Sequence, residues 1–436
     1  MPEPLFYNRQ VETLDRARLR SLQDERLRAL LKEIAANRFY SERLRAAGIT
    51  WGEVRSLDDL AGLPFTTKHD LVAEQEAAPP YGNLPTYALD RYRYFHQTSG
   101  TSGRPLKWLD TEESWDWWAR CWGYVYGGAG VTSEDVVFCA FSFGPYISHW
   151  TAITGAWRAG AMSISGGGLS SDQRLSLLLD NRATVLVSTP TYALHLAEVA
   201  RERGIDLSRC AVRVNIHAGE PGASLPAVRR KIEQEWGSTC FDHAGATEVG
   251  AWAFACQAES EAIHLNEAEF IFEIIDPETT RLLDPTATAR GELVITNLGR
   301  AGMPVVRYRT GDIVEIGHEP CACGRSFAQI RGGVLGRADD MIIVRGVNLY
   351  PSAIDDLLRT LPNVVEYEVE IRKVAGLDDL LIKIEVDDAS GFEEAARAVL
   401  AEFRSRFNMR VEVEQLLAGT LPRYEFKARR YKRIAD

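Results

Sequence analysis

Short apolar runs alternate with helical stretches between residues 136 and 248, and this alternation restricts the fold more than any other feature. Residues 136–140, 184–188 and 212–217 have the composition of buried strands, whereas helices are expected from Pro190 and over residues 225–236. Strands that alternate with helices form a mainly parallel sheet, which the helices cover. The sequence therefore predicts an α/β fold with functional loops at the carboxyl ends of the strands.

Three polar segments that contain glycine are expected at such strand ends, namely residues 98–107, 217–222 and 243–248. The first begins Thr-Ser-Gly-Thr-Ser-Gly, so four hydroxyl groups and two glycines fall within six residues. Glycine allows backbone N–H groups to face an anion, and hydroxyl groups add donors. The segment suits a phosphate chain, although it lacks the Gly-Lys-Ser/Thr ending of a P-loop. A flexible polar turn is the alternative.

The flanking regions have other patterns. Residues 11–47 have the apolar spacing of helices, and the tryptophans at positions 115, 118 and 122 lie at helical spacing. These tryptophans are more typical of a core face than of a cofactor platform. After His264 the pattern alternates as in antiparallel strands, over residues 269–275, 291–296 and 305–316.

The last hundred residues read as a separate unit. A helix is expected from about Ser352, followed by two strands, a helix over residues 392–407 and a strand near 410–414. This order predicts a small α+β domain. We place the boundary at about Asp339, which gives a large domain over residues 1–338 and a small one over residues 339–436.

Composition excludes several classes of function. The chain of 436 residues has a formal net charge of -11, which argues against a nucleic-acid binder. Seven cysteines are an odd set in a chain too long to need disulfides, which favours a reducing compartment. No apolar run approaches the roughly 20 residues that span a bilayer, and the first residues do not resemble a secretion signal. We therefore expect a cytoplasmic protein with no membrane or nucleic-acid partner.

Several motifs resemble those of the adenylate-forming superfamily, and over nearly its whole length the chain looks most like the phenylacetate–CoA ligase branch. The motifs lie at residues 63–68, 98–107, 165–167, 247–248, 308–312, 336–348 and 422–427. The resemblance implies an ATP-dependent ligase that converts a carboxylate into acyl-AMP, releases pyrophosphate and transfers the acyl group to CoA. Such a reaction needs oriented donors and Mg²⁺ at the phosphates.

The resemblance also assigns the nucleotide site. Residues 98–103 would hold the β- and γ-phosphates, Thr247 the α-phosphate, and Glu248 the Mg²⁺ ion. Asp312 would bind both ribose hydroxyls. The implied ATP-binding residues are Thr98, Ser99, Gly100, Thr101, Ser102, Gly103, Gly219, Glu220, Pro221, His243, Ala244, Gly245, Asp312, Arg331 and Arg337. The family usually has an aromatic residue near Ala244, so the partner that stacks on adenine is undefined. Glu220 is alternatively an acid at a helix N-terminus. Lys107 lies at the end of the motif over residues 98–107 and is alternatively a surface lysine.

The resemblance implies an acyl pocket at residues 141–150 and 165–168. Glycines beside aromatic residues there would form a flat slot for an aryl ring. The expected lining consists of Phe141, Tyr146, His149, Ser165, Gly166 and Gly167. Alternatively, Phe141 and Trp150 belong to the core, and His149 is a satisfied polar residue.

The resemblance gives three roles to the C-terminal residues. Lys427 would bridge the substrate carboxylate and the α-phosphate, Asp339 would be the hinge of a mobile domain, and Gly346 would let the pantetheine arm of CoA approach. Phe426 replaces the glycine usual before the lysine. One more solvated cation in a basic tail is the alternative for Lys427.

A metal site of another kind is expected from Cys256, His264, Cys321 and Cys323. Three thiolates and an imidazole form a tetrahedral zinc set, and some members of the resembled branch carry one. Cys240 and His318 are reserve ligands, and buried free cysteines are the alternative.

The sequence thus predicts an aryl-CoA ligase for a benzoate, anthranilate or phenylacetate type of acid. Its expected cofactors are ATP, Mg²⁺, CoA and a structural zinc ion. Two alternatives stay open: an enzyme that loads a carrier-protein thiol, and a non-catalytic nucleotide-binding relative. The expected partners are the small aromatic acid, CoA or a carrier protein, and a second copy of the chain in a homodimer.

Overall fold

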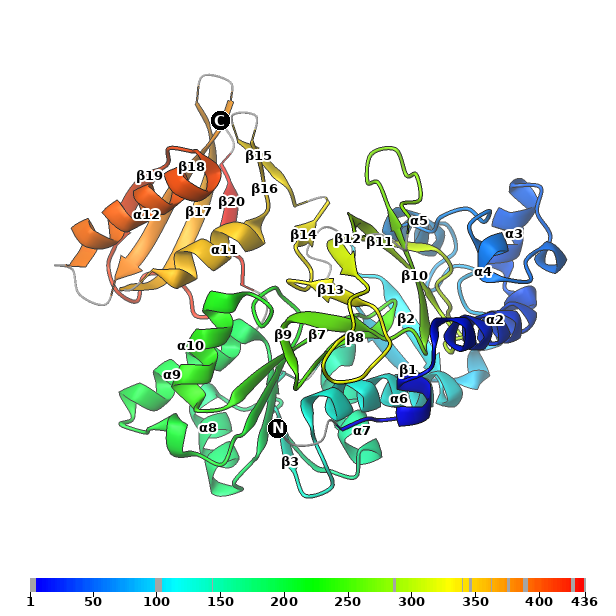
Figure 1. Ribbon diagram of the computed structural model, residues 1–436, viewed down its shortest axis with the longest axis horizontal. Coiled ribbons are helices and arrows are strands. Elements are labelled where there is room, and N and C mark those ends of the chain that lie inside the picture. Colours follow the sequence, from blue (N-terminus) through cyan, green and yellow to red (C-terminus); the bar gives the residue numbers. More distant parts are fainter. Residues whose placement is uncertain are drawn as a thin grey trace.

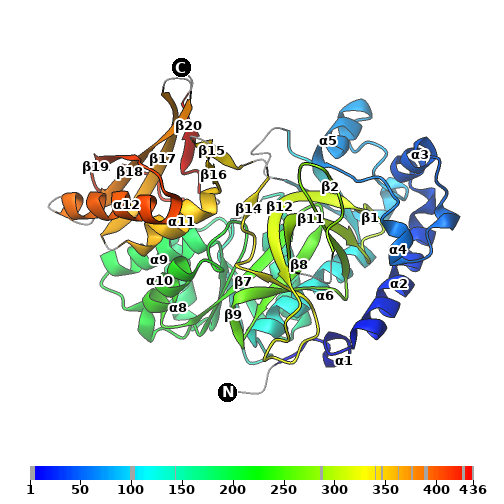
Figure 2. The same cartoon turned by 45° about the horizontal axis from the view of Figure 1, so that its top comes forward.

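The computed structural model has an N-terminal part built on a large mixed sheet and a smaller C-terminal part (Figures 1 and 2). It describes residues 5–98, 104–142, 144–284, 288–338, 340–344, 347–361, 363–374, 377–386, 391–424 and 428–434. We call the described residues up to 338 the N-terminal part and those from 340 onward the C-terminal part. The predicted fold class is confirmed: α/β with a parallel half, an antiparallel β region and a small α+β end.

Helices at one end of the molecule precede the sheets (Figure 1). They are α1 (Arg9–Glu12), α2 (Arg16–Glu33), α3 (Arg38–Ala46), α4 (Leu57–Leu60) and α5 (Lys68–Ala77), with short 3-10 turns at Ile34–Ala36, Trp51–Glu53 and Leu89–Arg91. The apolar stripe of α2 is buried as expected, since Leu27, Leu30 and Leu31 are almost fully covered. Thr67 caps α5, because its side-chain oxygen accepts the Asp70 N–H at 3.2 Å.

The parallel half of the sheet has helices on both faces. Its strands are β3 (Val136–Cys139), β4 (Met162–Ser165), β5 (Val185–Ser188), β6 (Val214–His217) and β7 (Thr239–Ala246), in the spatial order β7-β6-β5-β3-β4. Helices α6 (Glu112–Ala129) and α7 (Ile147–Arg158) share one core with it. A second core lies against α8 (Ser171–Asp180), α9 (Pro190–Glu202), the turn Leu207–Arg209 and α10 (Pro226–Trp236). The three tryptophans at helical spacing are buried in α6, which confirms that they belong to the core.

The antiparallel half continues from β7. It contains β8 (Gly250–Cys256), β9 (Glu259–Leu265), β10 (Phe270–Ile275), β11 (Ala289–Asn297), β12 (Tyr308–Gly317), β13 (Gln329–Arg331) and β14 (Gly336–Arg337), in the order β10-β11-β12-β13-β9-β8-β7, with β14 beside β12. Strand β8 is buried along its whole length, so it has no alternating pattern that would reveal a strand.

The expected position of the phosphate loop needs a correction. Strands β1 (Tyr92–Gln97) and β2 (Lys107–Thr111) form an antiparallel sheet of their own. Residues 98–106 therefore connect two strands of a hairpin and do not follow a strand of the parallel sheet. The other two expected segments do lie at strand ends, one after β6 and the other at the end of β7.

The C-terminal part has its own hydrophobic core. Its elements are β15 (Ile342–Val344), β16 (Val347–Leu349), α11 (Pro351–Thr360), β17 (Val364–Val374), β18 (Leu377–Val386), α12 (Phe392–Phe407), β19 (Glu412–Leu416) and β20 (Tyr431–Arg433). The main strands lie in the order β19-β18-β17-β20. In both views α11 lies beside α10, so the C-terminal part sits over the helical layer α9–α10 (Figures 1 and 2). Among the described residues, no helix combines the length and the apolar character needed to cross a membrane.

Candidate active site and metal centre

The base of the phosphate-loop hairpin is closed by Thr98. Its backbone N–H donates to the Leu106 carbonyl at 2.9 Å, and its buried hydroxyl accepts the Leu106 N–H at 3.0 Å. Lys107 begins β2, and its backbone N–H is held by the Gln75 side chain at 3.0 Å. The expected phosphate ligands Ser99, Gly100, Thr101, Ser102 and Gly103 lie outside the described residues.

The Thr-Glu pair lies in the turn between β7 and β8. Glu248 is buried, and the Tyr308 hydroxyl donates to its carboxylate at 2.9 Å. Burial raises the pKa of Tyr308 well above its ordinary value, so this hydroxyl stays protonated and remains a donor. A carboxylate has further acceptor positions. Glu248 therefore keeps the capacity to bind a hard cation such as Mg²⁺.

A buried ion pair behind this turn joins it to the phosphate hairpin. Arg300 is fully buried and bonds both carboxylate oxygens of Asp110, at 2.7 and 2.6 Å. The same guanidinium donates to the backbone carbonyl of Thr247 at 2.6 Å. Asp110 lies on β2, so Arg300 fixes the Thr-Glu turn relative to the hairpin. Sequence reasoning missed this pair, because its members are 190 positions apart and no motif contains Arg300.

The expected ribose ligand Asp312 lies on β12 opposite Arg337 on β14. The Arg337 guanidinium donates to the Asp312 carboxylate and to the Thr310 carbonyl, each at 3.2 Å. Arg331 instead forms a half-exposed ion pair with Glu319 at 2.6 Å. Of the two arginines named from the sequence, the structure thus brings Arg337 to the aspartate.

The segments expected to flank adenine follow β6 and end β7. Gly219 has a φ of +95°, which only glycine adopts without strain, and Pro221 is exposed beside it. At the end of β7, Ala244 is half-buried and Gly245 is exposed. The His243 ring faces the core, where Nδ1 lies 2.8 Å from the Ala253 carbonyl. Burial lowers the pKa of His243 to about 4, so the ring is neutral.

The Glu220 side chain has an unexpected position. One carboxylate oxygen accepts the backbone N–H of Thr191 in the first turn of α9, at 2.9 Å. The other accepts the backbone N–H of Ala428 at 3.0 Å. Glu220 does lie at a helix N-terminus, but at that of α9 and not of the helix that follows it in the sequence.

Most of the expected acyl-pocket residues come together at the ends of β3 and β4. The His149 Nε2 atom lies 3.2 Å from the Ser165 hydroxyl, which also accepts the Gly167 N–H at 3.2 Å. Burial lowers the pKa of His149 below its ordinary value. A methyl group at Gly166 would lie 2.9 Å from the Phe138 ring, so close packing on β3 explains this glycine.

The aromatic residues of the expected pocket differ in exposure. Phe141 is partly buried against the core, while 37% of Tyr146 is exposed at the start of α7. Trp150 is 40% exposed and its indole N–H donates to the Gly144 carbonyl at 3.2 Å, so it is not a core residue. Lys427, Asp339 and Gly346 lie outside the described residues, and their roles stay predictions.

The four residues predicted to bind zinc come from separate segments of the sequence and come together in the structure. Cys256 ends β8, His264 lies on β9, and Cys321 and Cys323 lie in the loop before β13. One ligand atom from each lies within 4.8 Å of the others. The Sγ atoms of Cys256 and Cys321 are 3.6 Å apart, and Cys323 Sγ is 3.4 Å from His264 Nε2. The reserve residues do not join them, because Cys240 belongs to the core around α9 and His318 is exposed.

The surroundings of this cluster suit a metal ion with soft ligands. His264 Nδ1 lies 3.2 Å from the Phe327 carbonyl, which fixes the tautomer that presents Nε2 to the thiols. The backbone N–H of Arg325 points at Cys323 Sγ from 3.4 Å. Hydrogen bonds from Cys256 and Cys321 lower the pKa of the Cys323 thiol and so favour the thiolate that binds metal. A buried Cys₃His set of this kind fits a structural zinc ion.

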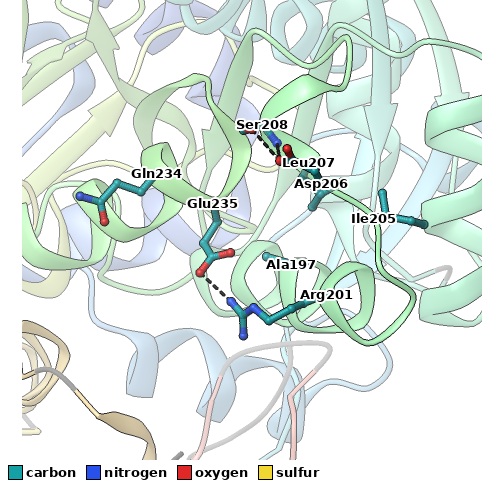
Figure 3. Close-up of a pocket in the computed structure, with 8 residues that line it drawn as sticks. All are labelled: Ala197, Arg201, Ile205, Asp206, Leu207, Ser208, Gln234 and Glu235. Atoms are coloured by element: carbon teal, nitrogen blue, oxygen red, sulfur yellow. Dashed lines mark hydrogen bonds and ion pairs between the residues drawn. The ribbon is translucent and has the colours of Figure 1, made fainter.

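A surface hollow of about 270 Å³ between α9 and α10 lies apart from these groups (Figure 3). It is lined by residues such as Ala197, Leu207 and Gln234, and an ion pair of 2.7 Å between Arg201 and Glu235 lies at its wall. It contains none of the residues expected to bind ATP or the acid.

Comparisons with known proteins agree with this arrangement. Residues 346–435 match the family of AMP-binding enzyme C-terminal domains. The chain is 31% identical to a phenylacetate–coenzyme A ligase from Thermus thermophilus, over 91% of this chain and 88% of the relative. It is also 31% identical to the phenylacetate–coenzyme A ligase of Escherichia coli K12, over 96% and 95% of the two chains.

Solved structures give the same answer. The crystal structure of a 2-hydroxyisobutyryl-CoA ligase in its postadenylation state, in complex with R3-HIB-AMP, matches with a TM-score of 0.93 at 27% identity. The match covers 98% of this chain and 92% of that one. The same ligase in its thioesterification state, with 2-HIB-AMP and CoA, gives a TM-score of 0.74 at 28% identity, over 98% and 91% of the two chains.

These relatives and the arrangement of the motif residues indicate the same family. The identity extends over nearly the whole of both chains, and the solved relatives share the N-terminal and C-terminal parts. The chain therefore belongs to the phenylacetate–coenzyme A ligase family of adenylate-forming enzymes, and it is an AMP-forming acid–CoA ligase that uses ATP and CoA.

Proposed function

We propose that the acid activated by this ligase is a small aromatic carboxylate, of the benzoate, anthranilate or phenylacetate type. The observation that carries this proposal is the 31% identity to phenylacetate–CoA ligases over more than nine tenths of the chain. The contact between His149 and Ser165 supports it, because Phe141 and Tyr146 lie in the segment that leads into the helix of His149, and aromatic side chains next to small residues suit a flat ring.

The nucleotide would be held by residues from both halves of the mixed sheet. Glu248 would bind Mg²⁺ and Thr247 the α-phosphate, with Arg300 and Asp110 fixing the turn that carries them. Asp312 would accept the two ribose hydroxyls while Arg337 neutralises its charge. Bound Mg²⁺ would supply charge stabilisation at the phosphates.

Lys427 would enter the site with the C-terminal part and neutralise the substrate carboxylate and the α-phosphate as they approach each other. Two observations support a small mobile domain over residues 339–436 that follows a large domain over residues 1–338. Residues from Ile342 to Val411 have a core of their own, and the two states of one solved relative match this chain to different degrees. Asp339 is the proposed hinge, and Gly346 the proposed approach of the pantetheine arm.

A substrate panel tests the proposed acid. Pyrophosphate release would be measured with benzoates, aminobenzoates, hydroxybenzoates and phenylacetates, in the presence of ATP and Mg²⁺. 2-Hydroxyisobutyrate serves as the aliphatic comparison, since a solved relative carries that acyl group as its adenylate. We expect kcat/KM to be highest for one of the aromatic acids. A preference for the aliphatic acid by tenfold or more (about 1.4 kcal/mol) would contradict the proposal.

The acceptor of the acyl group is tested in the same assay. With free CoA present, the enzyme should form and release the CoA thioester in repeated turnovers. Faster acylation of a carrier-protein thiol than of free CoA would favour the carrier-protein alternative. A homodimer stays a prediction, which light scattering would test directly.

We further infer that the Cys₃His cluster binds a structural zinc ion. The support is the convergence of four soft ligand atoms within 4.8 Å, three of them on buried residues. The cluster joins the ends of β8 and β9 to the loop before β13, and the neighbouring Arg325 bonds Glu12. Zinc would therefore hold together the ends of interior strands of the mixed sheet and take no part in the reaction.

A further inference from the structure

We propose that Glu220 is a positioning residue, whose carboxylate holds the C-terminal segment next to Lys427 in the arrangement that adenylation requires. This inference rests on the proposed role of Lys427, and it assigns the Glu220 side chain a task separate from any contact of its backbone with adenine. It concerns two described residues, Glu220 and Ala428, of which the second directly follows the lysine.

The carboxylate of Glu220 bonds two backbone groups from different parts of the molecule. The Thr191 N–H, at 2.9 Å, belongs to the first turn of α9. N–H groups in a first turn lack partners within the helix and attract negative charge. Thr189 accepts the N–H of Tyr192 at 3.2 Å, so Glu220 serves another N–H of the same turn. The second oxygen accepts the Ala428 N–H at 3.0 Å. The helix therefore orients the carboxylate, and the carboxylate orients the segment.

Two arginines tie the same segment to α9 on either side of residues 425–427. Arg423 bonds Glu198 of α9 at 3.2 Å and Glu385 of its own part at 2.9 Å. Arg430 bonds Glu366 at 2.7 Å and reaches the Thr191 hydroxyl at 3.5 Å. The Arg423–Glu198 pair is partly exposed, so it contributes little on its own. The Glu220 contact lies closest in sequence to the lysine and bonds the backbone itself through a charged acceptor, so it restrains the described residue that follows Lys427 most directly.

The contact depends on the arrangement of the two parts. Thr191 and Glu220 belong to the N-terminal part and Ala428 to the C-terminal part, so a rotation that withdraws Lys427 must break the bond to Ala428. The described chain matches the postadenylation-state relative with a TM-score of 0.93, against 0.74 for its thioesterification state. Glu220 thus holds an arrangement like that of the postadenylation-state relative, which carries an acyl-AMP, and would release the segment for thioester formation.

Separate assays of the two half-reactions test the proposal. Glu220→Ala removes both bonds, and Glu220→Gln keeps one acceptor oxygen but places an amide N–H₂ against a second N–H. The loss of a hydrogen bond to a charged group typically changes an equilibrium or rate constant by roughly tenfold or more. We expect kcat for acid-dependent ATP–pyrophosphate exchange to fall about tenfold or more in Glu220→Ala and by less in Glu220→Gln. The KM for ATP and the rate of thioester formation from supplied acyl-AMP and CoA should stay within about twofold.

A matched control excludes a general effect of losing a carboxylate at this helix layer. Glu235 pairs with Arg201 of α9 at 2.7 Å (Figure 3), and Glu235→Gln should leave both half-reactions unchanged. Equal loss of both half-reactions in Glu220→Ala, or a raised KM for ATP with kcat intact, would overturn the inference. So would unchanged exchange activity.

A double-mutant comparison separates this inference from the proposed function. If Glu220 acts through Lys427, adding Glu220→Ala to Lys427→Ala should cause no further loss of exchange activity. Losses that multiply would show that Glu220 acts by another route and would overturn the inference alone. Normal exchange activity in Lys427→Ala would refute the proposed role of the lysine, and the inference that rests on it would then fall as well.

Discussion

Glu248 and Asp312, which are expected to hold Mg²⁺ and the ribose, are already engaged by neighbours. Tyr308 donates to Glu248, and Arg337 donates to Asp312. Neutral and charged donors of this kind orient a carboxylate without using all of its acceptor positions. A carboxylate that is held in place before the ligand arrives loses less side-chain entropy on binding. Tyr308 and Arg337 therefore organise the proposed site before the nucleotide binds.

The charge of Glu248 can be tested without changing its shape. Glu248→Gln keeps an oxygen that accepts from Tyr308 but removes the negative charge proposed to hold Mg²⁺. We expect pyrophosphate release to fall by roughly 10²-fold or more, the effect of one electrostatic element. Tyr308→Phe is the control, because it removes the orienting hydroxyl and keeps the charge; its loss should be smaller. Near-normal pyrophosphate release by Glu248→Gln would contradict the Mg²⁺ assignment.

At the scale of secondary-structure elements, the ends of β8 and β9 meet the loop before β13 at the Cys₃His cluster. Protein purified without chelators should contain about one zinc ion per chain by metal analysis. Cys323→Ser should lose the metal and unfold at a lower temperature, because metal binding contributes to folding free energy. Cys240→Ser, which alters a buried cysteine outside the cluster, is the control and should keep the zinc. Zinc-free wild-type protein of full stability would contradict the prediction.

A second element-scale contact links stability to pH. Glu366 on β17 is buried between Arg359 of α11 and Arg430. Burial alone would raise the pKa of Glu366, but the two arginines outweigh burial and lower the pKa to about 2, from 4.5 in an unfolded chain. A lowered pKa stabilises the fold above pH 4.5, and this contribution is lost as the pH falls from 4.5 towards 2. The contribution of the lowered Glu366 pKa to the free energy of unfolding is on the order of 3 kcal/mol.

Acid unfolding of the wild type and of Glu366→Gln would measure this contribution. The variant should be less stable at pH 7, because it leaves two buried guanidinium groups without their counter-ion. Its stability should also depend less on pH between 4.5 and 2 than that of the wild type. Identical pH dependence in the two proteins would show that Glu366 does not carry the effect.

Helices and strands were predicted best from the sequence where the local pattern of apolar residues determines them. The helix expected over residues 392–407 coincides with α12 (Phe392–Phe407), and the strand expected over residues 136–140 corresponds to β3. Helix α7 was not predicted, because its sequence contains β-branched residues and Gly155, which are poor helix formers. Gly155 is needed there: a methyl group on it would lie 2.3 Å from the Trp122 side chain of α6. Tertiary packing therefore overrides propensity in this helix.

The candidate site was predicted where motifs name single residues and missed where contacts are long-range. The grouping of Cys256, His264, Cys321 and Cys323 was predicted from residue type, whereas Asp312 and Arg337 were named from motifs but not as a pair. Residues 98–107 were predicted to follow a strand of the parallel sheet. The β1–β2 hairpin was missed, because the local sequence does not show which sheet a strand joins. The Glu220–Ala428 contact joins residues 208 positions apart, and no local pattern reports such a distance.

At the scale of the whole molecule, the C-terminal part rests on the α9–α10 layer through contacts on both sides of residues 425–427. These contacts hold the described residues on either side of the proposed catalytic lysine against the N-terminal part. In the proposed function, the thiol of CoA would reach the acyl group only after the lysine withdraws. Hinged rotation of one part against another is a common way to alternate between two active arrangements. The two half-reactions should therefore have different requirements.

Lys427→Ala tests this alternation in the whole enzyme. Removing the ammonium group should nearly abolish aryl-AMP formation from acid and ATP, because two anions must then approach each other without a neutralising cation. Thioester formation from supplied aryl-AMP and CoA should be largely spared, since the lysine would have left the site before that step. Lys432→Ala, which removes a cation of the same tail that pairs with Glu368 at 2.6 Å, is the control and should retain both activities. Equal damage to both half-reactions, or to neither, would refute the role of Lys427 and the alternation built on it.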